Sequence, residues 1–431
     1  MTTQTILPVD SQAVAQASKA RQEPEWLTDL RVQAANLAGS LELPKLEKTR
    51  LDRWDLSSFG TYREPQALAS VNELPEQVKT LVGDTNIIVQ RNSGAVYQTL
   101  SEELAGRGVI FTDLETAVRE HADLVRPYLG KAVEAGENLL TAVHAATWSG
   151  GVFLYVPKNV NVEIPLQALF LSDDSATSFS PHILIVADTN SSVTYVENFS
   201  SIGTGASLVQ NGVTEVFVKP GANVHFASVH NLTEGVTDLT YRRAVVENDG
   251  SVNWIVGEMN QGNSMSDITS ILKGNGSYSD AKVICVGTND QKLNLTTRAI
   301  HFGLSSNSDM ITRAVMRDQA TAIINGITKI EKGATGANGQ QTERVLMLSP
   351  KARGDANPIL LIDEDDVKAG HAASVGQVNQ DQVYYMMSRG ISREEATRLL
   401  IYGFLAPVVS EIPIAKLEEQ LQTMVERKLG Q

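Results

Sequence analysis

Hydrophobic positions at the start of the chain follow a helical spacing. Between residues 23 and 44, apolar residues recur four, seven and four positions apart, as on one face of a helix. A second helical pattern covers 112–131 and follows residues that can cap a helix. Between these patterns the sequence is mixed, and 86–90 is its clearest short strand. We therefore expect a mostly helical region over residues 1–150.

The pattern changes at residue 151, where short β-branched runs begin to alternate with Gly, Asn, Asp and Ser. Turn-forming clusters recur at intervals of about 26–31 residues, with one extra turn near residue 289. They centre near residues 190, 221, 249, 275, 306 and 335. Helix-length amphipathic segments do not separate the strands, which argues against a doubly wound α/β sheet. The period favours parallel strands coiled as a β-helix over 151–378, with an antiparallel sandwich or barrel as the alternative.

Helical patterns return over residues 379–431. Gly390 is expected to stop the first helix and Pro407 to end the second, whereas the third begins at Pro413 and carries an apolar stripe. Apolar stripes must be buried against another surface. These helices are therefore expected to cap the strand stack, and they could also present a surface to a partner protein.

Composition excludes several classes of protein. The formal net charge is −14, and basic residues do not cluster, which argues against nucleic-acid binding. The pair Arg242–Arg243 is interpreted as a solvated strand position. Apolar runs are too short to span a bilayer, and the first residues lack a secretory pattern. The single cysteine, Cys285, cannot form an intramolecular disulfide and suits a reducing compartment, so we expect a cytoplasmic protein.

Motifs of catalysis and nucleotide binding are missing from the sequence. It has no GxxxxGK[ST], HExxH, GxSxG or CxxC pattern, so we expect neither a nucleotide site nor an enzyme of these kinds. Most histidines are interpreted as structural, and on a strand His225 and His230 would face opposite sides. Cys285 alternates with apolar residues and is expected to be a buried, inert thiol.

His371 has an unusual setting. It follows the acidic run 363–366 and lies among Gly, Ala, Ser and Val within 365–378. Such small neighbours allow another backbone or protein surface to approach closely. The imidazole could serve as a single metal ligand, completed by groups from another chain, or it could only pack at an interface.

Four segments of the chain resemble the SufB/SufD family of iron–sulfur cluster assembly scaffolds. They appear in the family's order and are residues 23–56, 151–167, 349–358 and 365–405. The chain is more similar to SufD-type than to SufB-type members. SufB-type members carry a late ligand cysteine and a Glu-His-Glu run, whereas here no cysteine follows Cys285, and Gly370 and Ala372 flank His371.

The resemblance implies a right-handed parallel β-helix between helical N- and C-terminal regions. It also implies a non-catalytic scaffold that pairs with a SufB-type paralogue through the β-helix and docks a SufC-type ABC ATPase through the C-terminal helices. His371 matches the SufD histidine at the SufB–SufD interface. It is therefore expected to contribute a ligand to a transient iron–sulfur cluster shared with SufB. The expected contacts with the ATPase lie within 384–405 and are Tyr385, Met386, Leu400 and Phe404.

Two other functions remain open from the sequence. The chain could be a purely structural partner of SufB, in which His371 only packs. A β-helical enzyme acting on acidic polysaccharide is a more remote alternative, because the acidic run supplies carboxylates while aromatic residues are only 6% of the chain.

Overall fold

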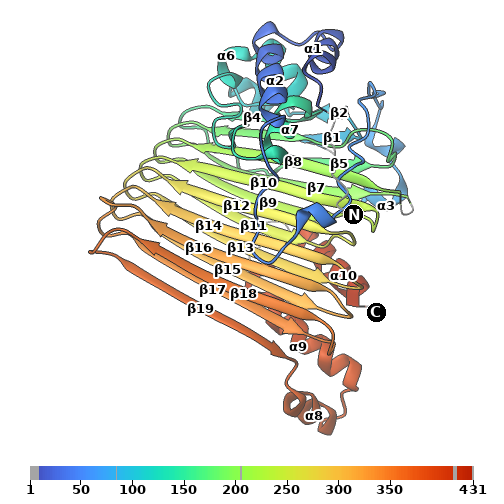
Figure 1. Cartoon of the computed structure of the whole chain (residues 1–431), viewed down its shortest axis with the longest axis vertical. Coiled ribbons are helices and arrows are strands. Elements are labelled where there is room, and N and C mark those ends of the chain that lie inside the picture. Colours follow the sequence, from blue (N-terminus) through green and yellow to red (C-terminus); the bar gives the residue numbers. More distant parts are fainter. Residues whose placement is uncertain (1–8, 84, 204–205, 411–414, 430–431) are drawn as a thin grey trace.

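The chain forms a long solenoid of parallel strands with helices near both ends (Figure 1). The structure is a computed structural model, and it describes residues 9–83, 85–203, 206–410 and 415–429. None of the helices in these ranges is both long and apolar enough to cross a bilayer.

The helices lie before and after the main run of strands. They are α1 (Ser11–Ala20), α2 (Glu25–Ala38), α3 (Glu76–Lys79), α4 (Glu102–Gly106), α5 (Leu114–Glu120), α6 (Ala122–Val125), α7 (Leu139–Thr147), α8 (Gln380–Ser388), α9 (Arg393–Val409) and α10 (Ala415–Leu429), with short 3-10 turns at Leu51–Arg53 and Val71–Glu73.

The strands form two sheets that face each other. The ten-stranded sheet contains β1 (Ile87–Arg91), β2 (Gly94–Thr99), β5 (Leu166–Ser172), β7 (Ser192–Ser201), β9 (Asn223–Asn231), β11 (Ser251–Glu258), β13 (Tyr278–Gly287), β15 (Asn307–Met316), β17 (Asn338–Met347) and β19 (Lys368–Gln377). The nine-stranded sheet contains β3 (Ile110–Asp113), β4 (Gly151–Val156), β6 (His182–Ala187), β8 (Leu208–Val218), β10 (Val236–Val246), β12 (Ser264–Leu272), β14 (Lys292–His301), β16 (Thr321–Ile330) and β18 (Arg353–Ile362).

From β4 onward, successive strands alternate between the two sheets, and each pairs in parallel with the strand one coil away. Ser192 pairs with Asn223, and Ser251 pairs with Tyr278. The sequence separation within each of these pairs agrees with the period of the turn clusters. The predicted parallel β-helix is therefore confirmed, and the antiparallel sandwich is excluded.

The inner faces of the two sheets enclose a narrow lumen filled by side chains. Aromatic rings stack along it from coil to coil, with centroids 4.5 Å apart for Phe170 and Phe199 and 4.9 Å apart for Phe226 and Trp254. Each such side chain contributes about 1.5–3 kcal/mol when it is fully buried. Parallel strands stacked in this way place residues of the same kind above one another, and the core is therefore continuous from coil to coil.

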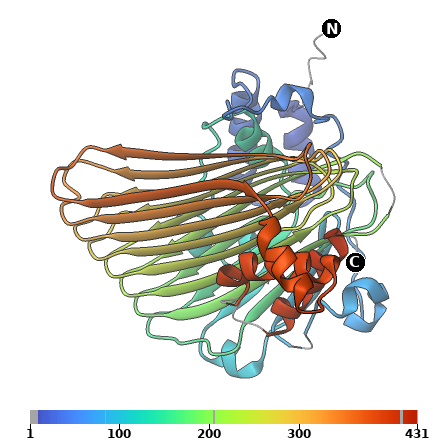
Figure 2. The same cartoon turned by 90° about the horizontal axis from the view of Figure 1, so that it is seen from below.

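Helices cover the outer faces, with different helices on each sheet. The N-terminal helices α5 and α7 pack on the nine-stranded sheet, whereas α9 and α10 pack on the outer face of the ten-stranded sheet. Figure 2 shows the C-terminal helices gathered on one side of the solenoid. Strands β1, β2 and β3 join the sheets from within the region expected to be mostly helical.

Two of the predicted helices differ from those in the structure. The segment 112–131 is broken at His121 into α5 and α6. Pro407 does not end its helix, because α9 continues to Val409. A proline in the last turn removes one N–H bond without terminating the helix at once. The predicted start of the last helix at Pro413 lies outside the described residues.

Candidate functional site

His371 lies at the open end of the solenoid, on the last strand of the ten-stranded sheet. Its strand partner is Gln341 of β17. Ala369, two residues earlier on β19, packs beside Ile330 in the interior, so this side of the strand faces the lumen. No further coil follows within the described residues, and the imidazole of His371 is therefore exposed.

The surroundings of His371 are small and accessible. A Cβ at Gly370 would lie only 2.4 Å from Oε1 of Gln340, so this position is suited to glycine. In the described part of the chain, no acidic side chain hydrogen-bonds to His371. In the acidic run, Glu364 instead accepts the N–H of Gly333 and pairs with Lys332. His371 therefore offers one accessible nitrogen ligand, from its imidazole ring.

Glu343 on β17 lies in the lumen close to this end and was missed by the sequence analysis. Its side chain is buried, and neither carboxylate oxygen has a hydrogen-bond partner on another described residue. Burial raises the pKa of Glu343 to about 7, and its own backbone N–H opposes this only in part. A single glutamate in this segment carries no sequence signal of its buried position.

Arg242 corrects one sequence prediction. The pair Arg242–Arg243 was expected to be solvated, but Arg242 is 0% exposed and Arg243 only 9%. Arg242 faces the lumen and donates to Ser266, whereas Arg243 faces outward and donates to the carbonyl of Ala132. Both faces of this strand are covered, so its odd-numbered and even-numbered residues are both shielded from solvent.

The Arg242 guanidinium lies in a buried group that could otherwise bind a metal ion. Ligand atoms of His230, Asp238 and Glu258 lie within 4.8 Å of one another. Nδ1 of His230 is 2.6 Å from Asp238, while the guanidinium is 2.6 Å from Nε2 of His230 and 3.3 Å from Glu258. Because the guanidinium already supplies the positive charge among these acceptors, the group is a structural ion network.

A second buried network joins the N-terminal region to the solenoid. Nε2 of His144, on α7, lies 3.0 Å from His182, which in turn lies 2.9 Å from Glu215. Glu215 also accepts the N–H groups of Gly130, Ala132 and Val133. Burial, reinforced by the neighbouring His182, holds the pKa of His144 well below its usual value. His144 is thus a neutral structural residue, as expected, and His182 was overlooked in the sequence.

Cys285 is a poor ligand where it lies. The thiol is 0% exposed inside the solenoid, and burial raises its pKa to about 12. Metal binding requires the thiolate. The prediction of a buried, inert thiol agrees with this environment, and the structure gives this chain an imidazole rather than a thiolate at the open end.

The four residues expected to contact the ATPase differ in exposure. Tyr385 is 59% exposed on α8. Met386 and Leu400 are half-buried between α8 and α9. The ring of Phe404 packs on the solenoid, where the Arg313 guanidinium lies 5.3 Å from its centroid. Beyond these four, α8 and α9 expose the apolar residues Tyr384, Met387 and Leu399.

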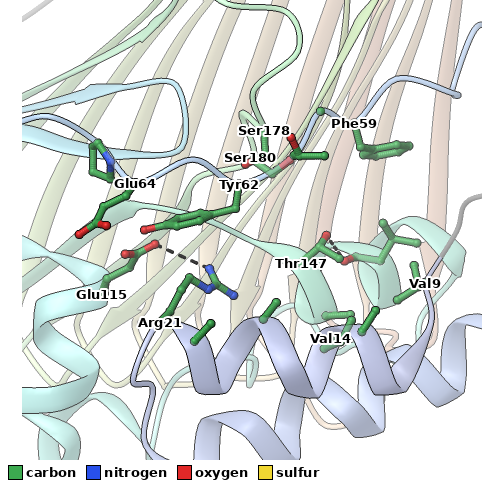
Figure 3. A pocket seen from close by; sticks show the side chains of 18 of the residues that line it. Val9, Val14, Arg21, Phe59, Tyr62, Glu64, Glu115, Thr147, Ser178 and Ser180 are labelled. Carbon is green, nitrogen blue, oxygen red and sulfur yellow. Dashed lines mark hydrogen bonds and ion pairs between the residues drawn. The ribbon is translucent and has the colours of Figure 1, made fainter.

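An open cleft lies elsewhere, between α1 and the N-terminal end of the solenoid, with a volume of about 1410 Å³ (Figure 3). Arg21 lines it, 3.9 Å from Glu115 and 3.2 Å from Glu23, with its guanidinium 4.9 Å from the Tyr62 ring. Burial raises the pKa of Glu115. The ion pair between Arg21, at the end of α1, and Glu115, on α5, thus connects these two helices.

Two family descriptions match consecutive parts of the chain. Residues 71–168 match "SufBD protein N-terminal region", and residues 170–404 match "SUF system FeS cluster assembly, SufBD core domain". The second match includes His371 and Glu343.

Curated proteins of similar sequence support the same family. The "Iron-sulfur cluster assembly protein SufD" of Bacillus subtilis (strain 168) is 48% identical over 436 residues, covering 100% of both chains. An "Iron-sulfur cluster assembly SufBD family protein" of Staphylococcus epidermidis (strain ATCC 12228) is 30% identical, over 93% of this chain and 89% of that protein.

Proposed function

Since the chain belongs to the SufBD family and is a SufD-type iron–sulfur cluster assembly protein, we propose that it is a non-catalytic scaffold subunit of a SufBCD-type complex. In this proposal it pairs with a SufB-type paralogue through the solenoid and docks a SufC-type ATPase through its C-terminal helices. Its coil is proposed to be right-handed. The division into 1–150, 151–378 and 379–431 would then separate an N-terminal region, the scaffold and the ATPase-docking region.

The cluster is the cargo of this scaffold, and His371 is proposed to supply one of its ligands at the SufB–SufD interface. The observation that carries the proposal is the exposed, lumen-facing imidazole of His371 on the last strand. An imidazole is a suitable iron ligand, and one such ligand leaves the remaining positions to a partner chain. A site divided between two chains can release its cluster when the chains move apart.

The open end also has the properties of an interface. Strands β18 and β19 terminate their sheets, and their outer edges have no strand partner among the described residues. Apolar side chains are exposed beside these edges, including Leu361 at 47% and Val375 at 43%. Free edges and apolar exposure favour strand pairing with another chain. A SufB-type solenoid is proposed to cover them.

The ATPase is proposed to dock on α8 and α9. The exposed aromatic rings of Tyr384 and Tyr385 lie close together in sequence on α8. Aromatic residues of this kind are enriched at the centres of interfaces. Met386, Leu400 and Phe404 support the surface from beneath in this proposal.

The test compares wild type with His371→Ala, each co-expressed with SufB-type and SufC-type partners and purified without oxygen. Iron and acid-labile sulfide are measured per complex. We expect the variant complex to assemble but to carry less than about a tenth of the wild-type iron and sulfide. Ser374→Ala is the matched control, because Ser374 is exposed on the same strand with the opposite parity.

Equal iron and sulfide in wild type and His371→Ala would show that this chain is a purely structural partner of SufB. If wild type itself forms no complex, the docking part of the proposal is wrong.

A further inference from the structure

A group of buried polar atoms lies in the lumen below His371. The atoms are both carboxylate oxygens of Glu343, Nε2 of Gln341 and Oγ1 of Thr312 and Thr297, and none has a hydrogen-bond partner on another described residue. All four side chains are only 1–2% exposed. Buried polar groups in proteins are nearly always satisfied by protein, water or a ligand. These atoms are therefore expected to have water or a bound ion as a further partner.

Strand pairing places these residues on neighbouring strands of two successive coils. Thr312 pairs with Glu343 on the ten-stranded sheet. Thr297 pairs with Gly326 on the nine-stranded sheet, and a Cβ at Gly326 would lie 1.8 Å from Oε1 of Glu343. The Glu343 side chain thus extends across the lumen, and the glycine on the opposite sheet leaves room for its carboxylate.

Glu343 has no cationic partner among the described residues. Glu258, another acidic residue of the lumen, pairs with Arg242. No ion pair or hydrogen bond from a described residue compensates Glu343 in this way. Burying a charged carboxylate without a partner is costly, so this carboxyl group either holds a proton or binds a cation that enters from outside.

His371 is within reach of the same cation. Gln341 pairs with His371, and Glu343 is two residues further along β17 with its side chain on the same face. Neighbouring strands are about 4.8 Å apart and alternate residues about 6.6 Å apart, which places the two Cα atoms about 8 Å from each other. A glutamate and a histidine at this separation can both reach one ion between them.

We propose that Glu343 and His371 together bind one divalent iron ion at the open end of the lumen, with Glu343 as the buried ligand and His371 as the exposed one. This inference rests on the proposed function and adds a second ligand from this chain. A carboxylate and an imidazole suit Fe²⁺, and two ligands leave positions for water, sulfide or the partner chain. The carboxylate also supplies the negative charge that a lone imidazole lacks.

Co²⁺ serves as the optical probe in the test, and Fe²⁺ added without oxygen serves as competitor. The purified full-length chain is titrated, and the visible absorption of the bound ion is recorded. We expect one Co²⁺ per chain, displaced by Fe²⁺, and at least a tenfold weaker Kd in both Glu343→Gln and His371→Ala. Glu343→Gln preserves shape, and Glu343→Asp, which keeps the charge, should retain part of the affinity.

Asp365→Asn is the control, since the Asp365 side chain is fully exposed in the acidic run, and it should bind Co²⁺ as wild type does. Wild-type affinity in Glu343→Gln, or no saturable binding by wild type, would overturn the inference. If only His371→Ala binds weakly, Glu343 is not a ligand while the proposed role of His371 stands. If both variants bind Co²⁺ weakly but the His371→Ala complex keeps its cluster, the proposed function fails and the ion site remains.

Discussion

Removal of the Arg242 guanidinium should destabilise the solenoid strongly. Arg242 is fully buried and contacts Ser266, Ser228, His230 and Glu258 at 2.9, 3.3, 2.6 and 3.3 Å. Arg242→Met keeps an unbranched apolar stem in place of the arginine stem but leaves the Glu258 carboxylate buried without its cation. Loss of one partner of a buried ion pair costs about 3–5 kcal/mol. We expect the free energy of unfolding to fall by that amount.

Equilibrium unfolding in urea, followed by far-UV circular dichroism and tryptophan fluorescence, measures this loss. The double variant Arg242→Met/Glu258→Gln removes both charges. We expect its loss of unfolding free energy to be smaller, by at least about 1 kcal/mol, than the sum of the losses in the two single variants. Arg50→Met is the control. Its pair with Asp52 is 2.7 Å long but the Arg50 side chain is 65% exposed, so its effect should stay within about 0.5 kcal/mol.

A loss below about 1 kcal/mol in Arg242→Met would refute the reasoning, since a buried unpaired charge costs more than that. It would mean that the lumen admits water freely enough to solvate Glu258. Failure of the double variant to recover stability would show that Arg242 acts through packing rather than through charge.

Two further predictions concern pH and partner binding. Burial lowers the pKa of His301 from 6.5 to about 4, so the unfolded state takes up its proton first, and the stability present above about pH 6.5 is lost as the pH falls toward 4. The stability lost between about pH 6.5 and pH 4 amounts to about 3 kcal/mol. His301→Gln should make the unfolding free energy depend less on pH over this range, and an unchanged pH profile would contradict the role given to His301. Tyr385→Ser, at a side chain 59% exposed, should weaken the proposed binding of a SufC-type ATPase at least tenfold in a pull-down titration, while Phe302→Ser, at an exposed aromatic residue on the solenoid, should not.

The sequence predicted the architecture because each coil needs its own turns. Asn, Asp and Gly at those turns recur with the coil, and several adopt the positive φ that these residues tolerate, as Asn190 and Gly221 do. The period of the coil was therefore visible without any contact information. The pairing of Ser192 with Asn223 and of Ser251 with Tyr278 reproduces it.

Side-chain environments could not be predicted from the same pattern. In a solenoid with helices on its outer faces, both parities of a strand can be buried, so alternation does not reveal which residues meet water. Arg242 was misjudged for this reason, and its partners come from the neighbouring strands β9, β11 and β12, whose contacts with it depend on the coil. Glu343 was missed because a single glutamate in "QQTERV" carries no signal until the neighbouring coils are in place.

The proposed cluster ligand His371 and the proposed ion site of Glu343 and His371 both lie at the open end of the solenoid, where the coil has less stabilisation from neighbours. In a stacked repeat each coil is stabilised by its neighbours, and the coil formed by β18 and β19 has a neighbour on one side only among the described residues. Its backbone amides should therefore exchange with solvent faster than those of the inner coils. His371 lies on the part of the chain that gains most order from a partner, so partner binding and formation of the site are thermodynamically linked.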